Sequence, residues 1–115
     1  ALPRHAGGET RDALEFGRRT QGNGSRVNVE YLPKFLKDLK ALKSNAVFEA
    51  INLLVFEEIP NLENLDSVSN LSKLKGFDDA FRIRVGDYRI GLFFDGETVT
   101  FARVLHRSEV YRYFP

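Results

Sequence analysis

The sequence contains no cysteine, no methionine and no tryptophan, and only two of its 115 residues are histidines. A chain without cysteine has no disulfide framework, no thiolate metal ligand and no cysteine nucleophile, and it suits a reducing cytoplasm. The two histidines, His5 and His106, are too few for a multi-histidine metal centre. We therefore expect a cytoplasmic protein that uses neither a metal ion nor a cofactor.

No apolar run approaches the roughly 18–20 residues that a membrane-spanning helix needs, so no membrane partner is expected. The chain is poor in proline, with four, but contains ten phenylalanines and four tyrosines. This composition is typical of a globular protein, and 115 residues allow one domain. The net charge of +1 does not provide the strong bulk field of many nucleic-acid-binding proteins. An anion-binding site must therefore come from a local cluster of basic side chains.

The first 26 residues differ from the rest of the chain. They are rich in glycine, arginine and polar residues, and their net charge is +2, against −1 for residues 27–115. Their few apolar residues follow no sustained period, and a helix of one or two turns is only marginally stable on its own. We therefore expect residues 1–26 to be a disordered N-terminal extension and residues 27–115 to form the folded domain.

A regular hydrophobic pattern follows this extension. Alternating apolar and polar residues predict a half-buried strand over residues 26–32. Apolar residues at helical spacing predict a helix that begins at Pro33 and a second helix that ends before Pro60, with a break at residues 44–45. These helices are expected to form a hairpin with one apolar face each. Residues 61–76 are predicted to be a long loop with a helical turn.

The remaining residues predict three strands, at 80–85, 88–94 and 97–105, joined by the two-residue hairpin signals Gly86-Asp87 and Asp95-Gly96. A short amphipathic helix is expected near the C-terminus. Together these elements predict an α+β fold. In this fold the helix hairpin packs on one face of a twisted, mainly antiparallel four-stranded sheet, with the element order β-α-α-β-β-β.

The predicted turns determine which side chains share a face of the sheet. A loop at Gly86-Asp87 places Arg84 directly opposite Arg89, with Arg82 two residues further along the same face. A two-residue loop after the next strand places small residues of the last strand beside these arginines and brings His106 to the same face. The sequence therefore predicts a shallow concavity rimmed by three guanidiniums and one imidazole.

Two explanations of the three arginines are open. They can form an ordinary solvated face paired with Asp78, Asp79 or Glu109. However, like charges directly opposite one another destabilise a sheet, which favours an anion-binding role. A guanidinium is a rigid fork of donors that matches phosphate oxygens, so the natural ligand is a polyphosphate backbone. Lys73 and Lys75 either extend this patch or are ordinary surface lysines.

Similar alternatives apply to the residues near the C-terminus. A lone histidine at a strand end is often structural, but an imidazole also titrates close to neutral pH and suits proton transfer. Tyr111 and Tyr113 either anchor the terminal segment to the core or contact a nucleobase or a phosphate.

Three motifs occur in order at characteristic spacing: K-L-K-G (73–76), A-F-R-I-R-V-G-D-Y-R-I (80–90) and V-L-H-R-S-E-V-Y-R-Y-F (104–114). With them, residues 27–115 resemble the RelE/ParE superfamily of bacterial toxins from type II toxin–antitoxin modules. The resemblance implies a RelE-like fold and a cognate antitoxin as a partner. RelE-type members cut mRNA on the ribosome without a metal, using basic residues to activate the ribose 2′-OH, stabilise the pentacoordinate phosphate and protonate the leaving oxygen.

The resemblance also implies roles for individual residues. The catalytic positions would be Arg82, Arg84, Arg89, His106, Arg107 and Tyr111. Lys75 matches the basic position before the loop glycine, and together with Lys73 and the three arginines it would bind RNA phosphates.

The sequence departs from the RelE pattern in two respects. RelE-type enzymes often have lysine where this chain has Arg82 and Arg84, and arginine is a poor general base because it stays protonated. Residues 27–115 also carry a net charge of −1, whereas ribosome-binding toxins are usually strongly basic. Two alternatives therefore stay open: a ParE-like inhibitor of DNA gyrase and an inactive RNA-binding relative.

Overall fold

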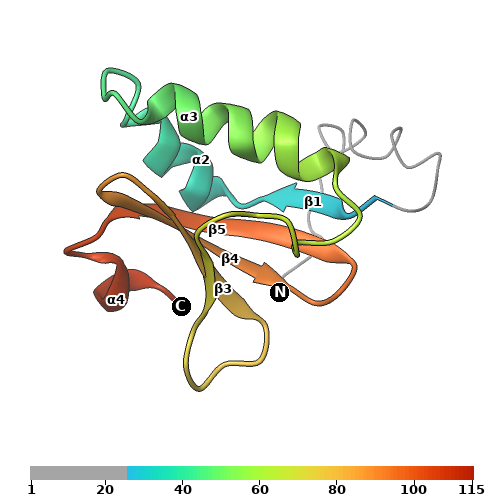
Figure 1. Ribbon diagram of the computed structural model, residues 1–115. Helices are drawn as coiled ribbons and strands as arrows, with labels where there is room; N and C mark the ends of the chain where they lie inside the picture. The colour runs from blue at the N-terminus through green and yellow to red at the C-terminus, as the bar shows by residue number, and fades with distance from the viewer. Residues whose placement is uncertain (1–25) are drawn as a thin grey trace.

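The computed structural model describes residues 26–115, so the extension expected over residues 1–26 lies outside the described residues, apart from Arg26. The chain order is β1 (Asn28–Tyr31), α2 (Pro33–Lys40), α3 (Phe48–Leu53), a π-helical segment (Leu54–Glu58), a 3-10 turn (Ile59–Asn61), β2 (Leu71–Lys73), β3 (Ala80–Val85), β4 (Tyr88–Phe94), β5 (Thr98–His106) and α4 (Val110–Tyr113) (Figure 1). Within the described chain, no helix is long and apolar enough to cross a membrane.

The sheet has five strands in the order β1-β5-β4-β3-β2. Strand β1 is parallel to β5, and the other neighbours are antiparallel. The α+β class and the mainly antiparallel sheet are confirmed, but the prediction of four strands was one short. The additional strand, β2, lies within the segment predicted as a loop. It is only three residues long and pairs through Leu71 opposite Ile83, so it is too short to show an alternating pattern.

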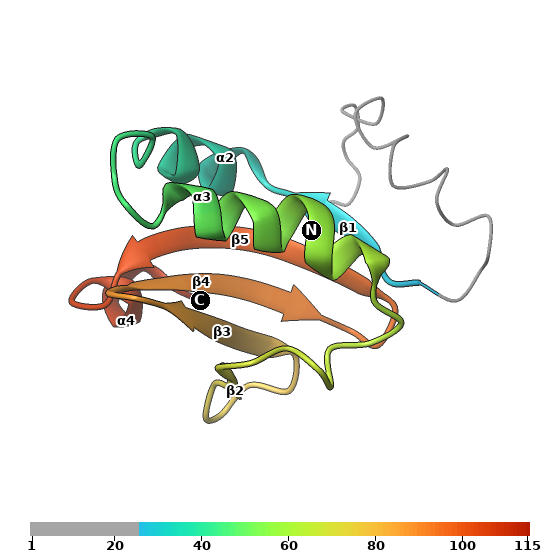
Figure 2. The ribbon, with the colours of Figure 1, turned by 45° about the horizontal axis from the view of Figure 1, so that its top comes forward.

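The two helices cover one face of the sheet, as predicted (Figures 1 and 2). Proline at the first position of α2 is compatible with its missing N–H, and no side chain caps this helix. The main core lies between the layers. Its fully buried members from the helical layer and the sheet include Phe35, Ile51, Val55, Ile59, Ile83, Ile90, Leu92, Val99 and Phe101.

The second helix changes its winding near its end. Helix α3 continues as the π-helical segment Leu54–Glu58 before the turn that contains Pro60. The Tyr31 hydroxyl donates a hydrogen bond of 2.7 Å to the Val55 carbonyl oxygen in this segment. Burial raises the pKa of the Tyr31 phenol above its ordinary value. Strand β1 and the wide helical turn are therefore joined by a hydrogen bond within the core layer.

The predicted pairing of β3 with β4 is confirmed. Gly86 adopts a φ of +61° in the two-residue loop, and Val85 pairs with Tyr88. Arg84 lies directly opposite Arg89, as expected. A turn of this kind determines the register of both strands locally, which is why the sequence was sufficient.

The predicted pairing of β4 with β5 was wrong. Phe94 pairs with Val99, so the connection is longer than the expected two-residue loop. The cause is Asp95, whose Oδ1 accepts the backbone N–H groups of Glu97 and Thr98 at 2.8 Å each, which satisfies them within the turn.

A β-bulge further along the same pair shifts the register again. The irregularity lies beside Gly91, where Leu92 pairs with Phe101 but Gly91 pairs with Arg103. Because an extra residue in one strand reverses the side-chain alternation beyond it, Val104 lies in the main core. His106 pairs with Tyr88, whose side chain packs against the main core. The expectation that His106 shares the arginine face is therefore wrong.

A second, smaller core lies on the opposite face of the sheet. Its buried members are Ala80, Ala102, Leu105, Val110 and Phe114. The Phe114 ring lies directly over Gly91, where an added β-carbon would be 2.6 Å from the ring. The predicted concavity with a floor of small residues is thus partly filled, because those small residues leave room for the C-terminal segment.

Candidate functional site

The arginine face, defined as Arg82 and Arg84 of β3 with Arg89 of β4, lies on the side of the sheet away from the two helices. Arg84 is exposed, and the other two arginines are half-buried. Arg82 pairs with Gly91. It lies two residues from Arg84 along β3 and therefore on the same face of the sheet. The β3–β4 hairpin therefore brings three cationic side chains to one surface, as the sequence predicts.

None of the three guanidiniums meets a carboxylate within residues 26–115. The ion pairs in this part of the chain join Arg103 to Asp38 and Arg107 to Asp87. The alternative of a solvated face paired with Asp78, Asp79 or Glu109 is therefore not what the structure forms. Three positive charges on adjacent strands are therefore left without a carboxylate partner in this part of the chain.

Neutral acceptors hold the two opposed arginines. The Arg84 guanidinium donates from Nη2 to Asn70 Oδ1 at 3.1 Å, and Arg89 donates from Nη1 to the carbonyl oxygens of Gly86 and Tyr88 at 3.0 Å each. Hydrogen bonds of this kind orient a guanidinium and leave its charge unneutralised. Each arginine thus points in a fixed direction and keeps its remaining donors for a ligand.

Arg82 is associated with the terminal helix α4. Its Cζ lies 4.8 Å from the centre of the Tyr111 ring, a cation–π contact. Tyr111 is 73% exposed, so its ring is open to solvent. Arg82 and Tyr111, predicted separately as site residues, therefore form one unit at the edge of the arginine face.

The structure separates Lys73, one of the two lysines of the predicted phosphate patch, from the arginine face. Lys73 pairs with Phe81, whose side chain packs against the main core, so the register places Lys73 on the helix side of edge strand β2. Lys75 is exposed in the loop after this strand, next to Gly76 with its φ of +86°. The expectation that Lys73 extends the arginine patch was wrong because β2 was not expected, and a strand places alternate residues on opposite faces. The role of Lys75 stays a prediction.

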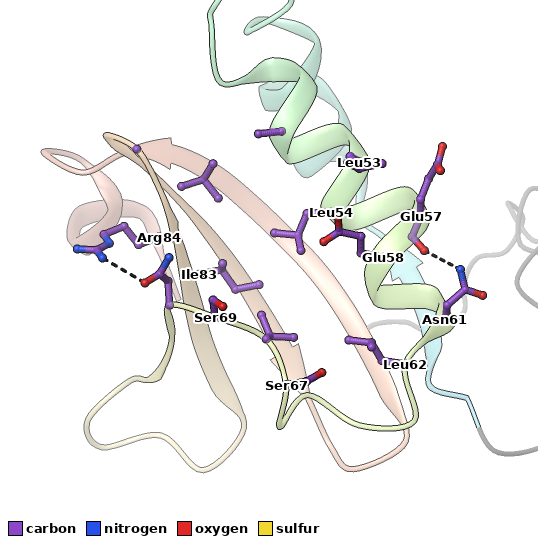
Figure 3. A pocket seen from close by; sticks show the side chains of 15 residues that line it. Leu53, Leu54, Glu57, Glu58, Asn61, Leu62, Ser67, Ser69, Ile83 and Arg84 are labelled. Atoms are coloured by element: carbon purple, nitrogen blue, oxygen red, sulfur yellow. Dashed lines mark hydrogen bonds between the residues drawn. The ribbon is translucent and has the colours of Figure 1, made fainter.

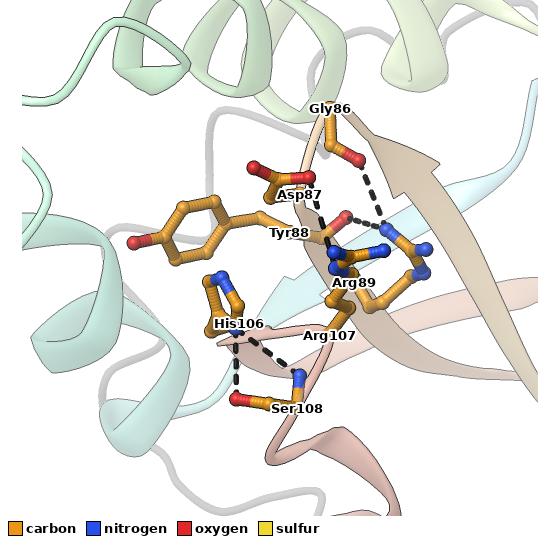
Figure 4. Close-up of polar contacts among 7 residues, drawn as sticks. All are labelled: Gly86, Asp87, Tyr88, Arg89, His106, Arg107 and Ser108. Carbon is orange, nitrogen blue, oxygen red and sulfur yellow. Dashed lines mark hydrogen bonds and ion pairs between the residues drawn. The ribbon is translucent and has the colours of Figure 1, made fainter.

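His106 lies at the end of the sheet, among residues of the β3–β4 turn and the loop before α4 (Figure 4). Its ring packs edge-on to Tyr88, with centroids 5.3 Å apart. Its Nδ1 lies 3.1 Å from the Ser108 backbone nitrogen and 2.8 Å from Ser108 Oγ. Because a backbone N–H only donates, Nδ1 is an acceptor and the neutral ring carries its proton on Nε2.

Arg107 faces the β3–β4 turn. Its Nε lies 3.8 Å from Asp87 Oδ1 and its backbone N–H donates to the Asp87 carbonyl oxygen at 2.8 Å. Both side chains are well exposed, so the ion pair is screened by solvent. Arg107 is therefore an exposed cation beside the β3–β4 turn, where the Gly86 carbonyl oxygen also accepts from Arg89. Within residues 26–115, no three metal-ligating side chains gather at one place.

Sequence reasoning missed a groove between α3 and strand β3 (Figure 3). It has a volume of about 960 Å³. Leu53 and Leu54 lie on its helical side with Glu57 and Glu58, and Ile83, Arg84 and Asn70 lie on the other side. The sequence signal for this groove was weak, because half-buried Leu54 also packs against the main core and Leu53 is a single exposed leucine beside it.

Comparisons with known proteins agree with this geometry. The model of the family described as "ParE toxin of type II toxin-antitoxin system, parDE" matches residues 29–111. The chain is 40% identical over 90 residues to toxin RelE3 of Methanocaldococcus jannaschii, which covers 77% of this chain and 100% of the relative.

Solved structures show the same fold. The toxin in the RelB-RelE antitoxin–toxin complex of Methanococcus jannaschii matches with a TM-score of 0.64 and 40% identity, over 75% of this chain and 99% of that chain. The YoeB dimer from Staphylococcus aureus matches in fold, with a TM-score of 0.55 and 21% identity over 70% and 97% of the two chains. The chain therefore belongs to the ParE toxin family, within the RelE/ParE superfamily of toxins from type II toxin–antitoxin systems.

Proposed function

We propose that this toxin is a metal-independent endoribonuclease that cleaves ribosome-bound mRNA and thereby arrests translation. The observation that carries the proposal is the direct opposition of Arg84 and Arg89 on a face where no described carboxylate compensates them. Like charges opposite one another destabilise a sheet, so an anion that relieves the repulsion is expected to bind there. The 40% identity to a toxin named RelE3 supports this choice.

In this proposal the opposed arginines act by electrostatics. During attack of the ribose 2′-OH, negative charge develops on the phosphate oxygens, and donors already fixed in place stabilise that charge. Arg84 and Arg89 are suited to this role because each is oriented by neutral acceptors. Arg82, held against Tyr111, contributes a third charge, and the exposed Tyr111 ring contacts the neighbouring nucleotide.

His106 and Arg107 act from the end of the sheet. Guanidiniums stay protonated, so none of the arginines is a general base. The Nδ1 atom of the His106 ring is occupied by Ser108, so Nε2 is the ring nitrogen left to contact RNA. We assign to the imidazolium form of His106, whose Nδ1–H can donate to Ser108 Oγ, proton donation from Nε2 to the leaving 5′-oxygen, while the proton of the 2′-OH passes to a water molecule. Arg107 and Lys75 add positive charge for the RNA backbone.

The experiment is primer extension on a reporter transcript translated by purified ribosomes. Wild-type protein should cut within codons, and Arg84→Ala should lower the rate on the order of 100-fold, the usual cost of removing one preorganised donor. The matched control is Lys43→Ala, which removes one exposed positive charge after α2. Cleavage that is equally weakened in both variants would show a general charge effect and contradict the proposal.

The description of the matching family, ParE toxin, favours a second candidate, inhibition of DNA gyrase. The net charge of −1 over residues 27–115 is also less than a ribosome-binding protein usually carries. Induced expression arrests growth under either candidate, so growth does not separate them. A gyrase supercoiling assay run beside primer extension does: intact transcripts with trapped gyrase–DNA complexes would replace the nuclease proposal.

We also propose a cognate antitoxin as the protein partner. The structural relatives include the RelB-RelE complex and the DinJ-YafQ complex of E. coli. An amphipathic antitoxin segment would fit the groove beside α3, with apolar side chains on Leu53 and Leu54 and an acidic one at Arg84. Co-expression with the product of a small adjacent gene should yield a nanomolar complex, and Leu53→Asp should weaken it while growth arrest by the free toxin persists.

A further inference from the structure

Asn70 contacts Arg84 at two points. Its backbone carbonyl oxygen accepts the Arg84 N–H at 3.1 Å, and its side-chain Oδ1 accepts Arg84 Nη2 at 3.1 Å. Asn70 lies immediately before β2. Because Leu71 pairs with Ile83 in the antiparallel register, one further step places Asn70 opposite Arg84. One residue of the loop thus holds both the main chain and the guanidinium of the exposed arginine.

The backbone of Asn70 is also exceptional. Among the non-glycine residues of the described chain, it alone has a positive φ, at +62°. This left-handed conformation is costly for most side chains and is best tolerated by asparagine and aspartate. The conformation ends the loop and starts β2 so that the Asn70 side chain reaches the guanidinium of Arg84.

We propose that Asn70 is a positioning residue for Arg84: its side chain holds the guanidinium in one direction and, being neutral, leaves the positive charge available to the RNA phosphate. This deepens the proposed function and rests on it. A carboxylate at the same place would hold the side chain equally well but would pair with its charge. Two properties of residue 70 therefore matter: its side chain orients the Arg84 guanidinium, and it carries no charge. Different substitutions test these two properties separately.

A purely structural role for Asn70 predicts a different result. If only its turn conformation is needed, glycine should replace it without loss, because glycine adopts a positive φ freely. The side-chain hydrogen bond is exposed, so its removal is expected to change the direction of Arg84 more than the stability of the fold. Asn70→Gly thus separates the backbone requirement from the side-chain requirement.

The test compares Asn70→Gly and Asn70→Asp with the wild-type chain, and uses Asn64→Gly as the matched control. Asn64 lies in the same loop and its Oδ1 accepts the Asp66 N–H at 2.8 Å, away from the arginines. Three quantities are measured for each: 15N relaxation of the Arg84 and Arg89 Nε–H groups, the cleavage rate in the primer-extension assay, and Tm. Growth arrest after induction serves as a readout of toxicity that does not depend on the target.

In Asn70→Gly, we expect the Arg84 Nε–H to become mobile while Arg89 does not change. The cleavage rate should fall on the order of 10-fold, since misplacing a catalytic group is costly, with a Tm close to that of Asn64→Gly. In Asn70→Asp, the Arg84 Nε–H should stay ordered, while the cleavage rate should fall at least as much as in Asn70→Gly. An unchanged Arg84 signal in Asn70→Gly, or a cleavage rate equal to that of Asn64→Gly, would overturn the proposal.

The proposed nuclease activity can fail independently of this inference. If the wild-type chain cuts no transcript, the nuclease proposal is wrong, whereas relaxation of Arg84 and growth arrest still show whether Asn70 positions it. Loss of Arg84 order together with loss of growth arrest would then support positioning for another target. Loss of order with undiminished growth arrest would contradict it.

Discussion

The carboxylate of Asp38 in α2 binds Arg103 and the backbone of β5 at once. It accepts from Arg103 Nε at 2.7 Å and Nη2 at 3.1 Å, and from the Val104 N–H at 3.1 Å. Strand β1 pairs with β5 only as far as Phe101, so the edge of β5 beyond that point needs another acceptor. Asp38 supplies it. The hydrogen bond that Arg103 donates to Asp38 also raises the pKa of the Arg103 guanidinium, which stays charged.

Asp38→Ala should therefore destabilise the fold strongly. The side chains of both partners are mostly buried, and the change leaves a guanidinium and a strand N–H without their acceptor. We expect a loss of about 2–4 kcal/mol in the free energy of unfolding, measured by urea denaturation. Asp87→Ala is the control, because its ion pair with Arg107 is exposed and should contribute about 0–1 kcal/mol. Equal losses in the two variants would contradict this account.

Tyr31→Phe should change how stability depends on alkaline pH. In wild type the folded state favours the neutral phenol, because burial raises its pKa above the ordinary value of about 10. The resulting stability is fully present below the unfolded-state pKa and is lost as pH rises above it. At pH 7 the variant should be less stable by about 1 kcal/mol, through loss of the hydrogen bond to Val55.

Above about pH 10 the wild-type protein should lose up to about 1.4 kcal/mol per pH unit that Tyr31→Phe does not lose. The difference in the free energy of unfolding between the wild-type protein and Tyr31→Phe should consequently fall to zero and then change sign. Guanidinium denaturation at a series of pH values from 7 to about 11 measures it. A constant gap across this range would show that Tyr31 ionises equally easily in both states.

Gly91→Ala should displace the C-terminal segment. An added β-carbon would lie 2.6–2.8 Å from three atoms of the Phe114 ring, closer than such atoms approach. We expect overpacking to cost about 1–3 kcal/mol. The double mutant Gly91→Ala/Phe114→Leu should be more stable than the sum of the single changes predicts, because the smaller side chain removes the collision. If the stability losses of the two single mutants simply add up in the double mutant, the strain does not come from the contact between residues 91 and 114.

Arg84→Ala and Arg89→Ala should differ in stability although both remove one charge from the same pair. Each relieves the cross-strand repulsion. Arg89 also donates to the carbonyl oxygens of Gly86 and Tyr88 and so supports the hairpin turn. Arg84→Ala should leave the Tm unchanged or slightly raised, whereas Arg89→Ala should lose about 1 kcal/mol. Thermal unfolding followed by circular dichroism decides this, and a stabilised Arg89→Ala would show that the turn contacts contribute nothing.

His106→Gln should reduce cleavage less than Arg84→Ala does. The histidine lies at the end of the sheet, on the side of Tyr88, so it is not one of the groups that hold the phosphate on the arginine face. If it donates a proton, the pH–rate profile of the variant should differ in shape from that of the wild-type protein, and the rate should fall about 10² or less. Single-turnover rates from pH 5.5 to about 8.5 measure this, and an unchanged profile would remove His106 from the mechanism.

Features that neighbouring residues encode were predictable from the amino-acid sequence. Helical spacing predicted the hairpin, and alternation predicted β1, β3, β4 and β5, because burial of one face requires those periods. Gly86 permits a turn that sets the register of its two strands, so the opposition of Arg84 and Arg89 was predictable. The three motifs likewise indicated the toxin superfamily before any fold was known.

Tertiary structure alone decided the features that depend on distant contacts. The bulge at Gly91 accompanies the packing of Phe114 from a later segment, and it is this bulge that moves His106 away from the arginine face. Asp38 and Asn70 reach Arg103 and Arg84 only after the layers and the edge strand are assembled. Periodicity records which face of an element is buried, but not which distant side chain comes to lie against it, since that contact exists only once the chain has folded.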